Sequence, residues 1–140
     1  MNGLVFGEKE EGVRYVERPS VYGLVIQEDK IAVMKMDDGR YFLPGGGKEP
    51  GETDERTLRR EFLEETGREI ENIEFVGRAE LYYYSERYEK HFFNEGAFYT
   101  CDMVGEGAGD HELVWLTIDE AIENLAHEHQ RWAVKKIKVR

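Results

Sequence analysis

The sequence contains a single cysteine, Cys101, among its 140 residues. One cysteine cannot form an internal disulfide, which excludes the class of small disulfide-stabilised folds. A lone thiol suits a reducing compartment, so we expect a cytoplasmic protein. We expect Cys101 to lie in a strand rather than to act as a nucleophile.

Long hydrophobic runs are also absent, and no basic start leads into an apolar stretch. A membrane-spanning helix needs about 20 mostly apolar residues. A secretory signal needs a charged start followed by an apolar core. We therefore expect neither a membrane anchor nor a leader, and no membrane as a partner.

Basic residues are in the minority, since 19 Lys and Arg face 30 Asp and Glu and the formal net charge is −11. This balance argues against nucleic acids and anionic lipids as partners, because both repel an acidic surface. A polyphosphate substrate stays compatible with the charge, because a bound metal ion inverts the local field.

Proline and glycine are missing from residues 53–66, and this absence predicts a helix. Thr53 is a suitable N-cap, and Asp54 and Glu55 place negative charge at the positive end of the helix dipole. Gly67 is a suitable left-handed stop.

Three glutamates share one face of this predicted helix. Glu61, Glu64 and Glu65 are spaced i, i+3 and i+4, which places them within an arc of roughly 100°. Like charges at these spacings repel, so a cation that neutralises them is expected. Mg²⁺ fits best, because it is commonly held by one or two carboxylates while it keeps waters and binds substrate phosphate oxygens.

The residues before the helix can supply the other half of a metal and phosphate site. Gly45–Gly47 follows an expected strand at residues 41–43, and a backbone without Cβ atoms can approach a ligand or turn a carbonyl toward a metal. Arg60 can fork onto Glu52 and hold its carboxylate in one orientation.

Residues 46–68 resemble the Nudix hydrolase box, which reads G, five residues, E, seven residues, R-E-U-x-E-E-x-G-U, where U is a bulky apolar residue. The matching positions are Gly46, Glu52, Arg60, Glu61, Phe62, Glu64, Glu65 and Gly67. The final U is Arg68 here, and Ile70 is the nearest apolar residue. This departure concerns packing at the helix end and leaves the metal face complete.

The resemblance implies an α/β fold, an α/β/α sandwich with a mixed β-sheet between helices. It also implies an enzyme that uses Mg²⁺, or Mn²⁺ in its place, to hydrolyse a small nucleotide. By this resemblance the metal ligands are Gly45, Glu61, Glu64 and Glu65, and the catalytic residues are Glu52, Arg60, Glu61 and Glu64. Carboxylates around one ion titrate as a coupled set, so whether Glu61 is a further ligand or the general base stays open.

Several functions are compatible with the box. The substrate is a nucleoside diphosphate linked to another group, or a nucleoside triphosphate in ordinary or oxidised form. Tyr84 lies 16 residues after the box, as a tyrosine does in the dinucleoside polyphosphate branch of the family, whereas the absence of proline after Pro50 argues against ADP-ribose. An RNA-end pyrophosphohydrolase, a nucleotide-sensing module with little catalysis and a non-enzymatic acidic protein are the remaining alternatives.

Residues outside the box complete the set of candidates. The candidates for contact with substrate are Arg18, Tyr84 and Glu112, with Arg78 or Arg87 as further partners of a distal phosphate. The candidates for an extra metal ligand or an alternative base are Glu106, Asp110 and Glu112. His127 and His129 are two residues apart and cannot imitate a zinc-binding pair on one helix face, so we expect a surface patch or a helix end there.

The remaining pattern predicts one domain over residues 1–140. An N-terminal hairpin is expected within residues 1–17 and could pair across a homodimer, and a second hairpin is expected from residues 21–27 and 31–35. Further strands are expected at 73–84, 92–103 and 113–116. Thr117 and Glu120 form a capping box that opens a helix, and Trp132, Ala133 and Ile137 mark a second helical stretch.

Overall fold

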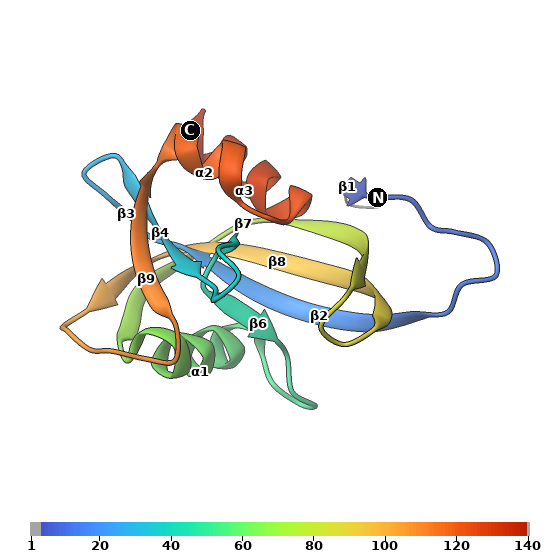
Figure 1. Ribbon diagram of the computed structural model, residues 1–140. Coiled ribbons are helices and arrows are strands. Elements are labelled where there is room, and N and C mark those ends of the chain that lie inside the picture. The colour runs from blue at the N-terminus through green and yellow to red at the C-terminus, as the bar shows by residue number, and fades with distance from the viewer. Residues whose placement is uncertain (1–3, 140) are drawn as a thin grey trace.

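The computed structural model describes residues 4–139 and has three layers. Figure 1 shows a curved mixed sheet in the middle, with α1 (Asp54–Thr66) on one side and α2 (Ile118–Asn124) with α3 (Glu128–Lys138) on the other. This arrangement confirms the expected α/β/α sandwich.

The strands form two sheets. The larger sheet has the order β1-β7-β8-β2-β6, with β1 (Leu4–Phe6), β7 (Glu69–Ser85), β8 (Lys90–Val104), β2 (Tyr15–Leu24) and β6 (Gly45–Gly47). The smaller sheet contains β3 (Ile26–Gln27), β4 (Lys30–Lys35), β5 (Tyr41–Phe42) and β9 (Glu112–Thr117). In the larger sheet β2 runs parallel to β8 over its whole length, while β6 lies antiparallel to the end of β2.

The helix boundaries follow the capping signals. The Thr53 side chain accepts a hydrogen bond from the Arg56 N–H at the start of α1, and Gly67 ends it in the left-handed region with φ 70°. The capping box of Thr117 and Glu120 is present at the start of α2. Among residues 4–139 no helix is long and apolar enough to cross a membrane.

Helix α1, the box helix, is held against the sheet by its apolar face. Phe62 is completely buried, and a Cβ at Gly23 of β2 would lie 2.5 Å from the Phe62 ring, so glycine permits this close approach. Phe62 belongs to a cluster of buried apolar side chains that also contains Ile70 and, on β8, Cys101. Ile70 therefore supplies the apolar contact at the helix end that Arg68 does not.

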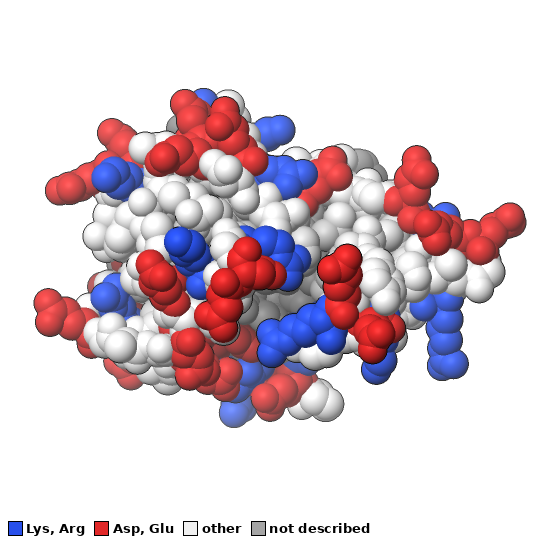
Figure 2. All heavy atoms as spheres, in the orientation of Figure 1, with Lys and Arg blue, Asp and Glu red and all other residues white. Residues whose placement is uncertain are grey.

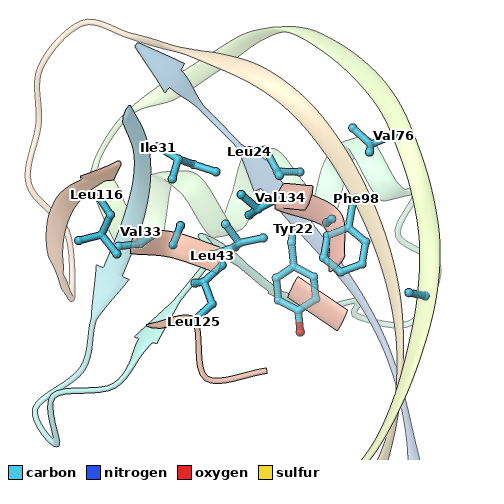
Figure 3. Close-up of a cluster of buried hydrophobic side chains, with 13 residues drawn as sticks. Tyr22, Leu24, Ile31, Val33, Leu43, Val76, Phe98, Leu116, Leu125 and Val134 are labelled. Carbon is cyan, nitrogen blue, oxygen red and sulfur yellow. The ribbon is translucent and has the colours of Figure 1, made fainter. Parts of the chain in front are cut away.

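A second apolar cluster fills the space between the sheet and α2 and α3. Figure 3 shows its members converging from β2, β4, β8 and the C-terminal helices, with Leu24, Phe98 and Val134 near its centre. Tyr22 contributes its ring, while its hydroxyl group points away from the apolar side chains. This orientation leaves one polar atom at the edge of the core.

The expected N-terminal hairpin does not form in the described residues. Leu4–Phe6 pairs in parallel with β7, where Leu4 lies opposite Ala79, and Tyr15 begins the long pairing of β2 with β8. The reason is that β7 and β8 are long enough to pair with both segments, so that β7 and β8 lie between β1 and β2 in the sheet. The part of the expected hairpin before Leu4 lies outside the described residues.

Two further expectations are corrected in part. In the second hairpin only Ile26–Gln27 pairs with β4, because residues 21–24 belong to β2 in the other sheet.

His127 is the residue before α3, as expected for a helix end, but His129 is fully buried and not part of a surface patch. Its ring packs edge-on against Tyr22 and Phe98.

The packing of the box helix generates a prediction about stability. We expect Phe62→Ala to lower the free energy of unfolding by about 3–5 kcal/mol, because it removes a fully buried ring and leaves a cavity. Chemical denaturation measures this change. The control is Phe75→Ala, since Phe75 is 50% exposed and contacts Tyr99 at its edge, and we expect a loss of no more than about 1.5 kcal/mol. Equal losses would contradict the described packing.

Candidate active site

The site begins where the glycine strand β6 meets the box helix α1. A Cβ at Gly46 would lie 2.7 Å from the carboxyl carbon of Glu61, so any other residue would displace this carboxylate. The Gly45 N–H donates a hydrogen bond to Glu65 Oε1 at 2.8 Å. Two of the three glutamates predicted on one helix face thus contact the glycine strand directly.

Arg60 and Glu52 form the fork expected from the sequence. Arg60 Nε donates to Glu52 Oε2 and Arg60 Nη2 donates to Glu52 Oε1, both at 2.8 Å. Glu52 also accepts from the Glu49 N–H and the Thr57 hydroxyl. The Arg60 guanidinium and these further donors lower the pKa of Glu52 to about 2, so it stays ionised.

Arg60 also connects this fork to the glycine strand and to the other glutamates. Its Nη2 donates to the Gly47 carbonyl at 3.0 Å, and its Nη1 donates to Glu61 Oε1 at 3.0 Å. The same Nη1 lies 3.6 Å from Glu64 Oε1. One guanidinium therefore holds the loop before α1, the glycine strand and the helix face together.

The three glutamates of the helix face differ in environment. The Glu64 side chain is 52% exposed, whereas that of Glu61 is only 15% exposed. Burial raises the pKa of Glu65 to about 8, with contributions from the nearby charges of Glu61, Glu64 and Asp110 and against the stabilising Gly45 N–H. Burial also raises the pKa of Glu61.

The donor set fits a hard divalent cation. In residues 4–139, no three acidic, histidine or cysteine side chains converge closely enough to hold a metal ion as they stand. The reason lies in their present partners, because Glu61 is held by Arg60 and Glu65 by the Gly45 N–H. The atoms nearby are carboxylate and carbonyl oxygens on one helix face and the adjoining strand, which are the ligands that Mg²⁺ and Mn²⁺ prefer.

The loop between β8 and β9 closes over the end of the box helix. The Asp110 N–H donates to the Glu64 carbonyl at 3.0 Å, and the Asp110 charge contributes to the raised pKa of Glu65. Glu112 instead begins β9 opposite Lys35, and Glu106 is exposed on the loop. Of the three acidic candidates in this region, Asp110 is the one whose contacts bring it to the glutamate cluster.

A cleft of about 1040 Å³ opens beside the glycine strand. Figure 2 looks onto this face and shows basic and acidic side chains around a hollow in its middle. The cleft is lined by Arg18, Tyr22, Met36, Asp38, Arg40, Phe42, Leu43, Gly45, Gly46, Glu65, residues 83–88, His127 and Gln130. The predicted substrate residues Arg18 and Tyr84 therefore both line the cleft, as does Arg87.

Other predicted residues lie elsewhere. Glu112 does not line the cleft. Arg78 lies 3.4 Å from Asp54 at the start of α1 and does not line the cleft either.

Sequence reasoning missed one wall of the cleft, which comes from residues far apart in the chain. Phe42, His127 and Gln130 line it together with Tyr22 and Tyr83. Gln130 carried a signal, because it shares the buried face of α3 with Ala133 and Val134, where the helical spacing calls for an apolar residue. A buried amide at such a position needs hydrogen-bond partners.

A family model described as NUDIX domain matches residues 16–136. The chain belongs to the Nudix family. Members of this family generally use a divalent metal ion and act on small nucleotides. A curated relative, a MutT-like protein from Streptomyces ambofaciens, is 43% identical over 60 residues, which are 41% of this chain and 39% of the relative. That match spans about two fifths of the relative's length.

Solved Nudix structures share this fold. A NUDIX hydrolase from Nitrosomonas europaea has a TM-score of 0.72 and 18% identity, and the match covers 89% of this chain and 90% of the other. A MutT protein from Bacillus halodurans has a TM-score of 0.68 and 25% identity, with coverage of 84% and 80%. An ADP-ribose pyrophosphatase from Streptococcus suis has a TM-score of 0.64 and 16% identity, with coverage of 88% and 92%.

The crowded glutamates generate a prediction about pH. Because the pKa of Glu65 is raised in the folded state, the metal-free protein binds more protons folded than unfolded between the unfolded pKa and about pH 8. Its stability therefore falls as pH rises toward 8, by up to about 1.4 kcal/mol per pH unit from this group.

We expect chelator-treated wild type to lose thermal stability from pH 6.5 to 8, and Glu65→Gln to lose much less. His127 and His129 have lowered pKa values in the folded state, and the resulting change of stability with pH is the same in both proteins, so it cancels in the comparison. Parallel pH curves for the two proteins, recorded by circular dichroism, would contradict the described burial of Glu65.

Proposed function

We propose that this protein is a Mg²⁺-dependent pyrophosphohydrolase that cleaves a phosphoanhydride bond in a nucleoside diphosphate linked to another group, or in an ordinary or oxidised nucleoside triphosphate. The observation that carries the proposal is the complete set of Glu52, Arg60, Glu61, Glu64 and Glu65 gathered where the glycine strand meets the box helix, with Glu65 lining the cleft. We also propose that residues 1–140 form a single Nudix domain, which the match of the NUDIX domain model to residues 16–136 supports.

The chemistry requires charge neutralisation at two adjacent phosphoryl groups and deprotonation of a water molecule. A bound Mg²⁺ supplies Lewis acidity at the phosphoryl oxygens and lowers the pKa of a bound water. We assign its binding to Glu61, Glu64 and Glu65 with the Gly45 carbonyl. Mn²⁺ has a similar preference for oxygen ligands and can take its place.

The side chains of the site divide the remaining tasks. The Arg60–Glu52 fork positions Glu61 and the glycine strand, because Arg60 donates to both Glu61 and the Gly47 carbonyl. Two carboxylates are candidates for the proton acceptor. Glu64 faces solvent, and Glu61 has a raised pKa that makes it a stronger base than an ordinary glutamate.

The lining of the cleft supports a phosphate chain beside the glutamates. Arg18 lies next to the glycine strand, with its Nε 3.5 Å from the position that a Cβ of Gly47 would take. Its charge acts on Glu61, so it lies near the helix face as well. A guanidinium in this place can bind phosphate oxygens that the metal ion does not contact.

The alternative functions receive less support. A sensing module is disfavoured by the complete box, and an RNA-end hydrolase by the net charge of −11. Tyr84 is 49% exposed and lines the cleft, which keeps a dinucleoside polyphosphate among the candidate substrates. Neighbours of similar fold include proteins named ADP-ribose pyrophosphatase and UDP-X diphosphatase, so the fold does not choose among substrates. The support for a cytoplasmic location is that Cys101 is the single cysteine of the sequence and is a free thiol.

The proposal predicts a specific loss of activity. With Mg²⁺ and a panel of nucleoside triphosphates, oxidised nucleotides, dinucleoside polyphosphates and nucleotide sugars, we expect release of phosphate or pyrophosphate from at least one compound. Glu64→Gln should lower kcat by about 10²-fold or more, because a ligand or base contributes on that order. The matched control is Glu55→Gln on the first turn of the same helix, where Glu55 forms an ion pair with exposed Arg59.

Equal turnover by wild type and Glu64→Gln would reject the assignment. A second measurement addresses the non-enzymatic alternative. Mg²⁺ should raise the melting temperature of wild type, because a ligand that binds only the folded state stabilises it. No shift at millimolar Mg²⁺ would count against the metal site.

A further inference from the structure

The inner wall of the cleft, made of Tyr22, Phe42, Tyr83, His127 and Gln130, differs in character from the glutamate side. The His127 ring lies 5.0 Å from the Phe42 ring and 4.6 Å from the Tyr83 ring, between centroids. Burial lowers the pKa of His127 to about 4 and raises that of Tyr22, so both are neutral at pH 7. The inner wall is therefore aromatic, polar and uncharged.

Such a wall suits an uncharged heteroaromatic ring. Aromatic side chains pack on one another and on nucleobases through their faces and edges. These groups provide no positive charge that would favour a phosphate or a carboxylate over a neutral ring. Among the parts of a nucleotide, the base is the one that matches this wall.

Gln130 offers a hydrogen-bond donor to a ligand. The residue is 1% exposed, and its Oε1 accepts the Leu43 N–H at 2.8 Å. This bond fixes the orientation of the amide and commits its oxygen to the backbone just before the glycine strand. The Nε2 amino group is left to donate.

A buried network sets the direction of the Tyr22 hydroxyl. His129 Nε2 lies 3.1 Å from Asn94 Oδ1, and Asn94 Nδ2 donates to the Tyr22 oxygen at 2.9 Å. His129 Nδ1 is buried without a partner in the described residues, which fits an acceptor nitrogen better than an N–H, because orphaned N–H groups are rare. Burial lowers the pKa of His129 to about 3, so the ring is neutral with its proton on Nε2.

The consequence for Tyr22 is that its own proton is not needed for the bond to Asn94. Its oxygen already accepts from Asn94, so its own proton is available to donate at the edge of the core, where Figure 3 shows the hydroxyl. Tyr22 and Gln130 thus present donors to the same cleft. A ligand that leaves such groups unpaired loses the hydrogen bonds that water would have supplied.

We propose that the inner wall binds a nucleobase through an edge rich in hydrogen-bond acceptors, as in guanine and uracil, and that Tyr22 and Gln130 supply the donors. Guanine presents O6 and N7, and the pyrimidine carbonyl at C4 is an acceptor, whereas adenine and cytosine place an amino donor at the corresponding position. This inference rests on the proposed function in taking the cleft to hold a nucleotide. It adds a preference for guanine over adenine and for uracil over cytosine.

The test is equilibrium binding of nucleoside monophosphates, which contain no phosphoanhydride bond and so do not depend on catalysis. By calorimetry with Mg²⁺ present, we expect GMP to bind at least about tenfold more tightly than AMP, and UMP than CMP. Each pair keeps ring size and phosphate constant and changes the polarity of the edge.

Variants assign this preference to residues. Tyr22→Phe should weaken GMP and UMP binding by about tenfold and leave AMP and CMP within about twofold. Gln130→Glu keeps an oxygen for the Leu43 N–H but replaces the donor with an acceptor, and should shift the preference toward AMP and CMP. The control is Tyr15→Phe, because the Tyr15 hydroxyl bonds the Glu10 N–H and does not line the cleft.

The outcomes separate the two proposals. Tighter binding of AMP and CMP by wild type, equal losses for all four nucleotides in Tyr22→Phe, or no binding of any of them overturns the inference, whether or not Glu64→Gln loses activity. If the expected preference appears while wild type and Glu64→Gln hydrolyse nothing, the base site stands and the proposed hydrolysis fails. If the Gln130→Glu protein does not fold, the result for Tyr22→Phe decides the inference.

Discussion

The bidentate pairing of Arg60 with Glu52 is the interaction on which the site depends. It joins the loop before α1 to the second turn of that helix, and the same guanidinium reaches the Gly47 carbonyl and Glu61. Removal of Arg60 would leave the Glu52 charge without its cation and would break the hydrogen bond from the helix to the Gly47 carbonyl. Arg60 therefore holds Glu52 and Glu61 in place, whereas the Gly45 N–H holds Glu65.

The two sides of the cleft differ in the interactions that they offer to a ligand. On the glutamate side, crowded carboxylates and a raised pKa at Glu65 favour a bound cation. On the inner wall, burial removes charge from His127 and His129, and a chain of hydrogen bonds through Asn94 orients the Tyr22 hydroxyl. In the nucleotide complex that we propose, electrostatics therefore serves the phosphates, and hydrogen-bond direction serves the base.

The glutamate side could be predicted from sequence because its residues are local. Thr53, Gly67 and the spacing of the glutamates lie within one helix, where a period of 3.6 residues fixes which side chains share a face. The inner wall could not be predicted, since β2, β5, β7 and α3 contribute to it and their proximity depends on strand pairing. The N-terminal hairpin was wrong for a related reason, because a local pattern identifies a strand and not its partner.

The turn between β7 and β8 extends past the helices and forms one rim of the cleft through residues 83–88. Most of these side chains are at least partly exposed, so their replacement costs little stability. Substitutions there can change the shape of this rim without touching Arg60 or the glutamates. In the hydrolase that we propose, such a separation would let the accepted substrate change while the bond-breaking machinery stays the same.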